Sequence, residues 1–245
     1  MLSKAKIKYI QTLGQKKQRE QERVFVAEGP KLVAELLAQC PGQVVEIFAT
    51  EDWINAGYQL PALLPVHRID DFELAKISQL TNPHQVVALV RMFDSSDLPD
   101  PAAAIVLALD AIRDPGNLGT IIRIADWFGI RHIVCSEDSA EVYNPKVVQA
   151  TMGSLFRVQV HYCSIADCLA QYPAERIYPP MLEGKSVRTI QPISTGVVLI
   201  GNEGQGISAA LQEKANVKVT IERRGAAESL NAAIATGIIL SHLVK

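Results

Sequence analysis

Residues 197–207, VVLIGNEGQGI, join four consecutive apolar residues directly to a loop with three glycines. A short apolar run without polar alternation is typical of a strand that is buried on both faces, as in a parallel sheet. In such sheets ligands collect at the carboxyl ends of the strands. These residues therefore predict a parallel α/β domain with a binding loop directly after residue 200.

Further apolar runs and helical stretches extend this pattern over the second half of the chain. The additional predicted strands are 103–109, 133–135, 158–160 and 217–221. The predicted helices are 118–128, 145–151, 165–171, 208–215 and 229–244. Alternation of strands and helices predicts an α/β unit with a mostly parallel sheet.

The first half of the chain also contains both kinds of pattern. Residues 30–38 have a helical pattern, and residues 44–49 and 86–91 have strand patterns. Residues 93–101 then interrupt the pattern with Ser, Asp and Pro, which are typical of a linker. A chain of 245 residues is long enough for two compact domains. We therefore predict a smaller α/β domain at 1–96 and a second domain at 101–245.

Composition narrows the class of protein. Apolar residues make up 48% and charged residues 20% of the chain, which is typical of a globular protein. The N-terminus reads MLSKAKIKYI, with charges where a signal peptide needs an apolar stretch, and no apolar run is long enough to span a membrane. The four cysteines form no C-x-x-C pair. We expect a cytoplasmic protein with reduced thiols, no metal site and no membrane contact.

The charge distribution singles out the N-terminus, because the net charge of −2 does not by itself indicate nucleic-acid binding. Residues 1–23 carry seven basic side chains against two acidic ones. A basic helix suits contact with RNA phosphates, and Lys16, Lys17 and Arg19 are the candidates. The alternative is a solvated helix face with no ligand.

Three loops carry candidate site residues. In 109–123, LDAIRDPGNLGTIIR, Asn117 is either a helix N-cap or a site residue, and Arg123 follows on the same helix. In 199–207 the glycines read G-x-x-G-x-G, which differs from the dinucleotide pattern G-x-G-x-x-G. They either expose backbone groups to a ligand, with Glu203 as an acceptor, or form a tight turn. In 221–231, Ser229 and Asn231 stand at a predicted helix start, where anions and carboxylates bind well, although Ser229 also suits an N-cap.

The succession N-x-G-x-x-x-R, G-N-E-G-x-G and S-L-N before a C-terminal helix resembles the SpoU (TrmH) family of RNA ribose 2′-O-methyltransferases. The resemblance covers roughly residues 101–245. Residues 25–33, FVAEGPKLV, also resemble the RNA substrate-binding extension found in this family. The implied fold is a C-terminal methyltransferase domain with a trefoil knot, an exception to the rule against knotted chains.

The resemblance also implies a cofactor, an oligomeric state and site residues. The cofactor is S-adenosylmethionine, and the family is homodimeric. The catalytic positions implied are Arg123, Asn117, Glu203, Ser229 and Asn231. The cofactor-binding positions implied are Gly201, Ile221 and Leu230, with help from Leu199, Ile200 and Gly206. The family's arginine is proposed to activate the ribose hydroxyl, but a guanidinium keeps its proton at neutral pH. It would act as a base only in an unusual environment, such as beside the substrate's phosphate, so stabilising the developing alkoxide is the physically easier role.

The sequence departs from the family pattern after Ile221. Glu222, Arg223 and Arg224 stand where the family usually has Pro and Met, and Arg223 is a candidate RNA contact. The N-terminal extension and the loop sequence DPGNLGT at residues 114–120 resemble the ribosomal-RNA branch of the family more than the transfer-RNA branch. They therefore favour ribosomal RNA as substrate. The alternatives are a transfer-RNA methyltransferase, a non-catalytic RNA-binding or ribosome-assembly protein on the same fold, and a nucleotide-dependent enzyme on an open sheet, which the missing G-x-G-x-x-G disfavours.

Overall fold

The structure is a computed structural model that describes residues 1–94, 103–202, 204 and 206–245. The chain divides into two compact units. The N-terminal unit comprises Met1–Asp94 and Glu141–Phe156, and the C-terminal unit comprises Ser95–Ala140 and Arg157–Lys245. Residues 141–156, which fall inside the predicted range 101–245, thus group with the N-terminal unit. Most of the predicted linker lies outside the described residues.

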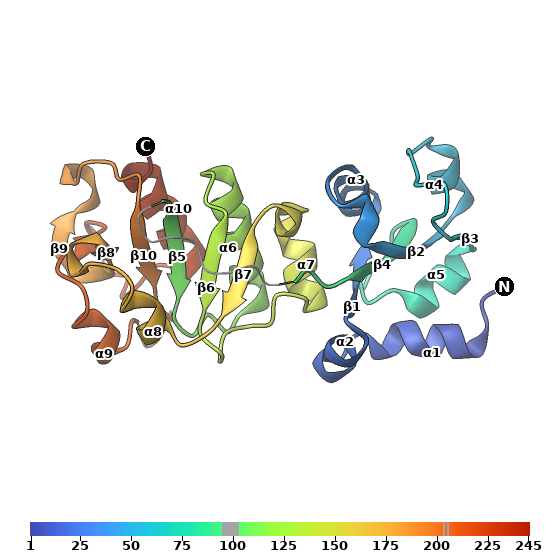
Figure 1. The fold of residues 1–245 in the computed structure, drawn as a ribbon, viewed down its shortest axis with the longest axis horizontal. Helices are drawn as coiled ribbons and strands as arrows, with labels where there is room; N and C mark the ends of the chain where they lie inside the picture. Colours follow the sequence, from blue (N-terminus) through green and yellow to red (C-terminus); the bar gives the residue numbers. More distant parts are fainter. Residues whose placement is uncertain (95–102, 203, 205) are drawn as a thin grey trace. The chain divides into compact units, whose positions relative to one another are not determined.

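The N-terminal unit is built on a four-stranded sheet with the order β1-β4-β2-β3 (Figure 1). Its strands are β1 (Val24–Glu28), β2 (Val44–Ala49), β3 (Val66–Arg68) and β4 (Val86–Arg91). Its helices are α1 (Lys4–Thr12), α2 (Lys16–Glu22), α3 (Pro30–Gln39), α4 (Glu51–Asn55), α5 (Asp71–Ile77) and α7 (Pro145–Thr151), with 3-10 turns η1 (Pro41–Gln43) and η2 (Ser154–Phe156). The predicted strands at 44–49 and 86–91 and the predicted helices at 30–38 and 145–151 are confirmed, whereas β1, β3, α4 and α5 were not predicted.

The basic N-terminus forms two helices rather than the single predicted helix. The Ser3 side chain caps α1, and the chain turns after Thr12 before α2 begins at Lys16. Ile10 and Leu13 are fully buried in a core with residues of β1, β2, β4 and α5. This packing holds α1 on the sheet and gives the turn at 13–15 a fixed place.

Arg19 is not the surface cation that the sequence suggested. Its side chain is 2% exposed and forms a salt bridge with Glu141. The same guanidinium donates hydrogen bonds to the carbonyl oxygens of Leu13 and Gly14, each at 2.9 Å. The prediction that Arg19 binds RNA is therefore wrong, because its donors already stabilise the turn between α1 and α2 and the segment that begins at Glu141.

Replacing Arg19 with alanine is expected to lower the free energy of unfolding by about 3–5 kcal/mol, because it leaves a mostly buried carboxylate and two carbonyls without their partner. The matched control is Arg23→Ala. Arg23 pairs with Asp94 at the surface, where side-chain exposures are 56% and 99%, so its loss should cost no more than about 1 kcal/mol. Urea unfolding of both variants measures the difference, and equal losses would contradict a buried structural role for Arg19.

The C-terminal unit contains a five-stranded sheet with the order β7-β6-β5-β10-β8; Figure 1 shows β7, β6, β5 and β10 side by side. Its strands are β5 (Ile105–Leu109), β6 (His132–Cys135), β7 (Gln159–Tyr162), β8 (Ile177–Tyr178), β9 (Pro180–Ser186), β10 (Gly196–Ile200) and β11 (Val219–Thr220). Its helices are α6 (Pro115–Trp127), α8 (Ile165–Leu169), α9 (Ala209–Gln212) and α10 (Ala232–Leu243), with 3-10 turns η3 (Ala174–Arg176) and η4 (Val187–Thr189).

All pairings in the five-stranded sheet are parallel, as predicted. Every residue of β5 and β10 is buried, which fits strands covered on both faces. Alternate residues such as Val106 and Leu199 pack against α8 and α9 in one core. The predicted strand at 217–221 is shorter and lies elsewhere, because β11 pairs only with β9 in a separate two-stranded sheet. Within the described ranges, no helix has the length and apolar character needed to span a membrane.

Candidate active site

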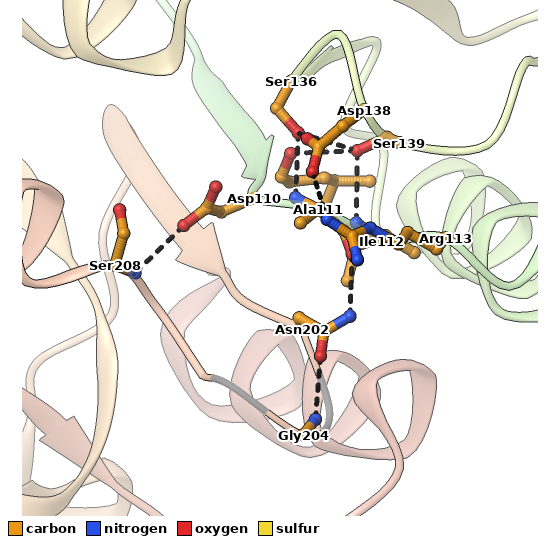
Figure 2. Close-up of polar contacts among 11 residues, drawn as sticks. Asp110, Ala111, Ile112, Arg113, Ser136, Asp138, Ser139, Asn202, Gly204 and Ser208 are labelled. Carbon is orange, nitrogen blue, oxygen red and sulfur yellow. Dashed lines mark hydrogen bonds and ion pairs between the residues drawn. The ribbon is translucent and has the colours of Figure 1, made fainter.

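Three strand ends meet at the carboxyl edge of the C-terminal sheet. Asp110 N donates a hydrogen bond to Ile200 O at 2.8 Å, and Ser136 N donates to Leu109 O at 3.0 Å. The loops after β5, β6 and β10 are therefore neighbours, and Figure 2 shows the polar contacts among them. The fold places a candidate site where a parallel sheet presents its loops.

The loop after β5 ends at the N-terminus of α6, and its cap is Asp114. The Asp114 carboxylate accepts a hydrogen bond from Asn117 N at 2.8 Å, and Pro115 occupies the first turn. This corrects the N-cap alternative for Asn117. The Asn117 side chain instead reaches another helix, because its Oδ1 accepts a hydrogen bond from Asn231 Nδ2 at 2.8 Å.

Asn231 has two roles at the start of α10. It is the N-cap, with its Oδ1 accepting from the backbone N–H groups of Ala233 and Ile234 at 3.0 and 3.2 Å. Its amide nitrogen donates to Asn117. The N-cap alternative for Ser229 is therefore wrong, and Ser229 lies exposed two residues before the Asn231 cap.

The structure brings together some predicted catalytic residues and leaves others apart. Asn117 and Asn231 are in direct contact. Arg123 lies on α6, about one and two-thirds turns after Asn117, with an exposed side chain. Glu203 lies outside the described residues. The helices α6 and α10 thus supply the first two members of the candidate site, with Arg123 farther along the same helix.

The glycine-rich loop after β10 is a closed hairpin. Asn202 and Gly206 exchange two backbone hydrogen bonds of 3.1 and 2.8 Å. A Cβ added to Gly201 would lie 2.4 Å from the carbonyl carbon of Gly206, so the two glycines are in close backbone contact. Gly206 has a φ of +68°, and apart from its chain neighbours no atom of the described residues lies within 4 Å of the place where its Cβ would stand. The loop is therefore a tight turn that still presents uncovered backbone.

The predicted cofactor-binding residues differ in how far their side chains are exposed to a ligand. Leu199 and Ile200 are 0% and 2% exposed, so their side chains belong to the core and serve only to place Gly201. Ile221 is half-buried, and Leu230 is 46% exposed. Leu230 precedes the Asn231 cap directly, which places an uncovered apolar side chain next to the Asn117–Asn231 contact.

A group of polar residues after β6 also belongs to this edge, and sequence reasoning missed it. Ser136 Oγ accepts a hydrogen bond from Ala111 N at 2.8 Å and donates to Asp138 Oδ1 at 2.7 Å. Arg113 pairs with Asp138 at 2.8 Å. Hydrogen bonds from Arg113 and Ser136 hold the pKa of Asp138 below its usual value. Ser and Asp directly after the apolar run 133–135 were the available signal.

Ala111 takes a backbone conformation that this group must hold in place. Its φ is +57°, in the left-handed region that non-glycine residues rarely adopt. Such a conformation costs about 1–3 kcal/mol and persists only when the surroundings fix it. Ala111 lies three residues before the cap of α6, so its conformation sets the direction in which the chain enters that helix.

Arg223 lies in the loop between β11 and α10. Its side chain is exposed, and its Nη1 donates to Ala227 O at 3.4 Å within the same loop. The neighbouring Glu222 pairs with Arg188 at 3.6 Å. These contacts stabilise the loop that leads to Ser229, and they leave Arg223 at the surface.

Comparison with known proteins identifies the family. The model of the SpoU rRNA Methylase family matches residues 104–241, more than half of the chain. The chain belongs to the SpoU methylase family. A second model, the MRM3-like substrate binding domain, matches residues 4–88. The two matches divide the family's catalytic and substrate-binding parts between the two halves of the sequence.

Relatives of this SpoU protein match along nearly its whole length. The 23S rRNA (guanosine(2553)-2′-O)-methyltransferase RlmP of Bacillus subtilis is 32% identical, over 97% of this chain and 95% of its own. A structure from Porphyromonas gingivalis assigned to the TrmH family has 34% identity, a TM-score of 0.88 and coverage of 100% and 98%. The AdoMet-bound rRNA methyltransferase of Sinorhizobium meliloti has 31% identity, a TM-score of 0.84 and coverage of 99% and 95%. The fold is thus the knotted α/β fold of this family.

Proposed function

We propose that this protein transfers a methyl group from S-adenosylmethionine to a ribose 2′-hydroxyl of ribosomal RNA in the cytoplasm. The observation that carries the proposal is the hydrogen bond between Asn117 and Asn231 at the joined starts of α6 and α10. The resemblance assigns both residues to the active site, and they are in direct contact although they lie 114 residues apart in sequence. Full-length similarity to an enzyme that acts on 23S rRNA supports the choice of RNA.

The residues present fit S-adenosylmethionine. The ligand has a flat adenine base with hydrogen-bonding edges and a charged methionine part, and sites for such ligands combine apolar surface with a few placed polar groups. The open backbone at Gly206 and the uncovered Leu230 side chain provide these two kinds of surface. Gly201, Gly206, Ile221 and Leu230 are the residues that would hold it. Bound there, it supplies a sulfonium methyl group that is already a strong electrophile.

The chain's own residues then have to bind, orient and stabilise the ribose. Asn231 is fixed by its capping bonds and fixes Asn117 in turn, so both amides are preorganised. The proton of the ribose 2′-hydroxyl leaves to solvent water, and Arg123 is the group that stabilises the alkoxide that develops, since a fixed positive charge needs no proton transfer of its own to act. Glu203 and Ser229 are proposed to complete the site.

The deciding experiment measures methyl transfer from labelled S-adenosylmethionine to under-modified ribosomal RNA and to unmodified transfer RNA. Ribose label on ribosomal RNA alone supports the proposal. Label on transfer RNA alone would contradict the proposed substrate and identify the protein as a transfer-RNA methyltransferase. Cofactor binding without transfer to either RNA, even on intact ribosomal subunits, would favour a non-catalytic assembly role.

Residues 1–96 are proposed to be the RNA-binding domain, with contact through α2. Lys16 and Lys17 are both exposed, and Lys16 has only a long 3.7 Å pairing with Glu20. Replacing both with glutamine is expected to weaken RNA binding and to lower the slope of log K against log salt by roughly 1.4, because each contact with single-stranded phosphate contributes about 0.7. Cofactor affinity should not change.

The control for this prediction removes two lysines from the C-terminal unit, Lys214 and Lys218, by the same substitution. It changes the net charge equally. If both double variants altered the salt slope to the same extent, the effect would come from total charge and not from α2. Arg223 is proposed as a further RNA contact and is tested in the same titration by Arg223→Gln.

A second copy of this chain is the proposed partner, seated on α6 and α10. The two helices pack against each other and leave Trp127 85% exposed and Ile234 56% exposed. Large apolar side chains in such positions mark an interaction surface. Because α6 also carries Arg123, an interface here places the site beside the subunit boundary.

Replacing Trp127 with glutamate is expected to convert the dimer to a monomer, because the interface would then bury an unpaired charge. Sedimentation equilibrium measures the mass. Phe72→Glu is the matched control, since Phe72 is 70% exposed on α5 of the N-terminal unit. A native protein that sediments as a monomer at micromolar concentration would contradict the proposed interface.

A further inference from the structure

Asn202 links two parts of the candidate active site that are 91 residues apart in sequence. Its side-chain Nδ2 donates a hydrogen bond to Ala111 O at 3.0 Å, in the loop that leads to α6. Its Oδ1 accepts a hydrogen bond from Gly204 N at 2.9 Å, within the glycine-rich loop. Figure 2 shows the side chain between the two loops. The Asn202 side-chain amide thus joins the glycine-rich loop, which would hold the cofactor, to the loop that leads into α6.

The link ends on the strained residue of this edge. Ala111 is held in its left-handed conformation from both sides, by Ser136 Oγ on its N–H at 2.8 Å and by Asn202 on its carbonyl. The next residue, Ile112, donates its N–H to Ser139 Oγ at 3.1 Å. Two residues later Asp114 caps α6 and fixes Asn117. The direction of α6 therefore depends on contacts that Asn202 completes.

A second contact joins the same two loops. Asp110 Oδ2 accepts a hydrogen bond from Ser208 N at 3.0 Å, where the glycine-rich loop ends. Asp110 and Asn202 thus tie both ends of the glycine-rich loop to the end of β5. Asn202 differs from Asp110 in one respect, because only Asn202 contacts the carbonyl of the left-handed residue.

We propose that Asn202 is a positioning residue for methyl transfer, which holds Ala111 in its left-handed conformation and so fixes the start of α6 against the glycine-rich loop. The inference rests on the proposed function. Asn202 acts through Asn117 and Arg123 and is not itself a catalytic residue. An asparagine suits the position because the two contacts require one donor and one acceptor on the same side chain.

The test is Asn202→Asp, which keeps the oxygen for Gly204 N but places an acceptor against the Ala111 carbonyl. We expect kcat to fall at least tenfold while the KM for RNA stays within twofold. Amide hydrogen exchange at residues 111–114 should become faster. Asn216→Asp, an exposed position in the same unit, makes the same change of charge and is expected to leave all three quantities unchanged.

The mechanism predicts a rescue. Glycine adopts the left-handed conformation without strain, so Ala111→Gly in the Asn202→Asp background should recover at least threefold in kcat. Ser136→Ala removes the other contact to Ala111 and should give the same loss and the same rescue, which keeps the test available if Asn202→Asp does not fold. An unchanged kcat in Asn202→Asp, or a double variant no better than the single one, would overturn the proposal.

Failure of the proposed function is distinguishable from failure of this inference. If the native protein transferred no methyl group, the proposed function and the positioning role would both be wrong. Hydrogen exchange would then still show whether Asn202 holds residues 111–114. If the native protein is active and exchange at 111–114 is the same in Asn202→Asp as in the native chain, only the inference is wrong.

Discussion

Replacement of Arg123 with alanine is expected to lower kcat for RNA methylation by about a hundredfold to a thousandfold, the usual effect of removing a group that stabilises a developing oxyanion. Arg123 is exposed on α6, and its exposed position predicts little loss of stability. Affinity for S-adenosylmethionine should therefore be retained. Single-turnover transfer to ribosomal RNA and calorimetric cofactor binding measure the two effects separately.

Two further variants sharpen this result. Arg123→Lys keeps the positive charge but loses the planar fork of donors, so partial activity would assign the effect to charge and full loss to geometry. Arg131→Ala removes an exposed arginine just after α6 and is the control. A kcat in Arg123→Ala within tenfold of the native value would contradict the role assigned to Arg123.

Gly201→Ala is expected to be the most damaging single methyl addition at this edge. The new Cβ would lie 2.4–2.5 Å from the backbone of Gly206 and Ile207, and no flexible side chain is there to move aside. The hairpin would have to open and lose its two backbone bonds to Asn202. We expect a loss of about 3 kcal/mol in the free energy of unfolding, together with loss of cofactor binding.

Gly204→Ala is the matched control in the same loop. Among the described residues, a Cβ at Gly204 would meet Asn202 Oδ1 at 3.5 Å, which is an ordinary contact. Thermal unfolding with and without S-adenosylmethionine compares the two variants. If Gly201→Ala bound the cofactor as tightly as Gly204→Ala does, the close contact between residues 201 and 206 would not be required for the site.

The local pattern of apolar residues was enough to predict most strands of the C-terminal sheet. Parallel strands buried on both faces are recognisable because each is a short run of apolar residues, and β10 and β5 lie within or close to the predicted ranges. The same apolar pattern led to a wrong prediction for residues 217–221, which were expected to belong to the parallel sheet of the C-terminal unit. Their pattern is equally apolar, and only the partner strand β9 assigns β11 to a different sheet.

The sequence by itself determined the main parallel strands of the C-terminal sheet, the family and the loops that carry Asn117, Arg123 and Asn231, because these depend on residue types at short spacings. Only the tertiary structure decided which cation is buried, which residues cap the helices and what joins the loops. Arg19 has the local sequence of a surface residue, and its burial depends on Glu141, 122 positions away. Asn202 likewise becomes informative only when folding brings the carbonyl of Ala111, 91 positions away, within hydrogen-bond distance of its side chain.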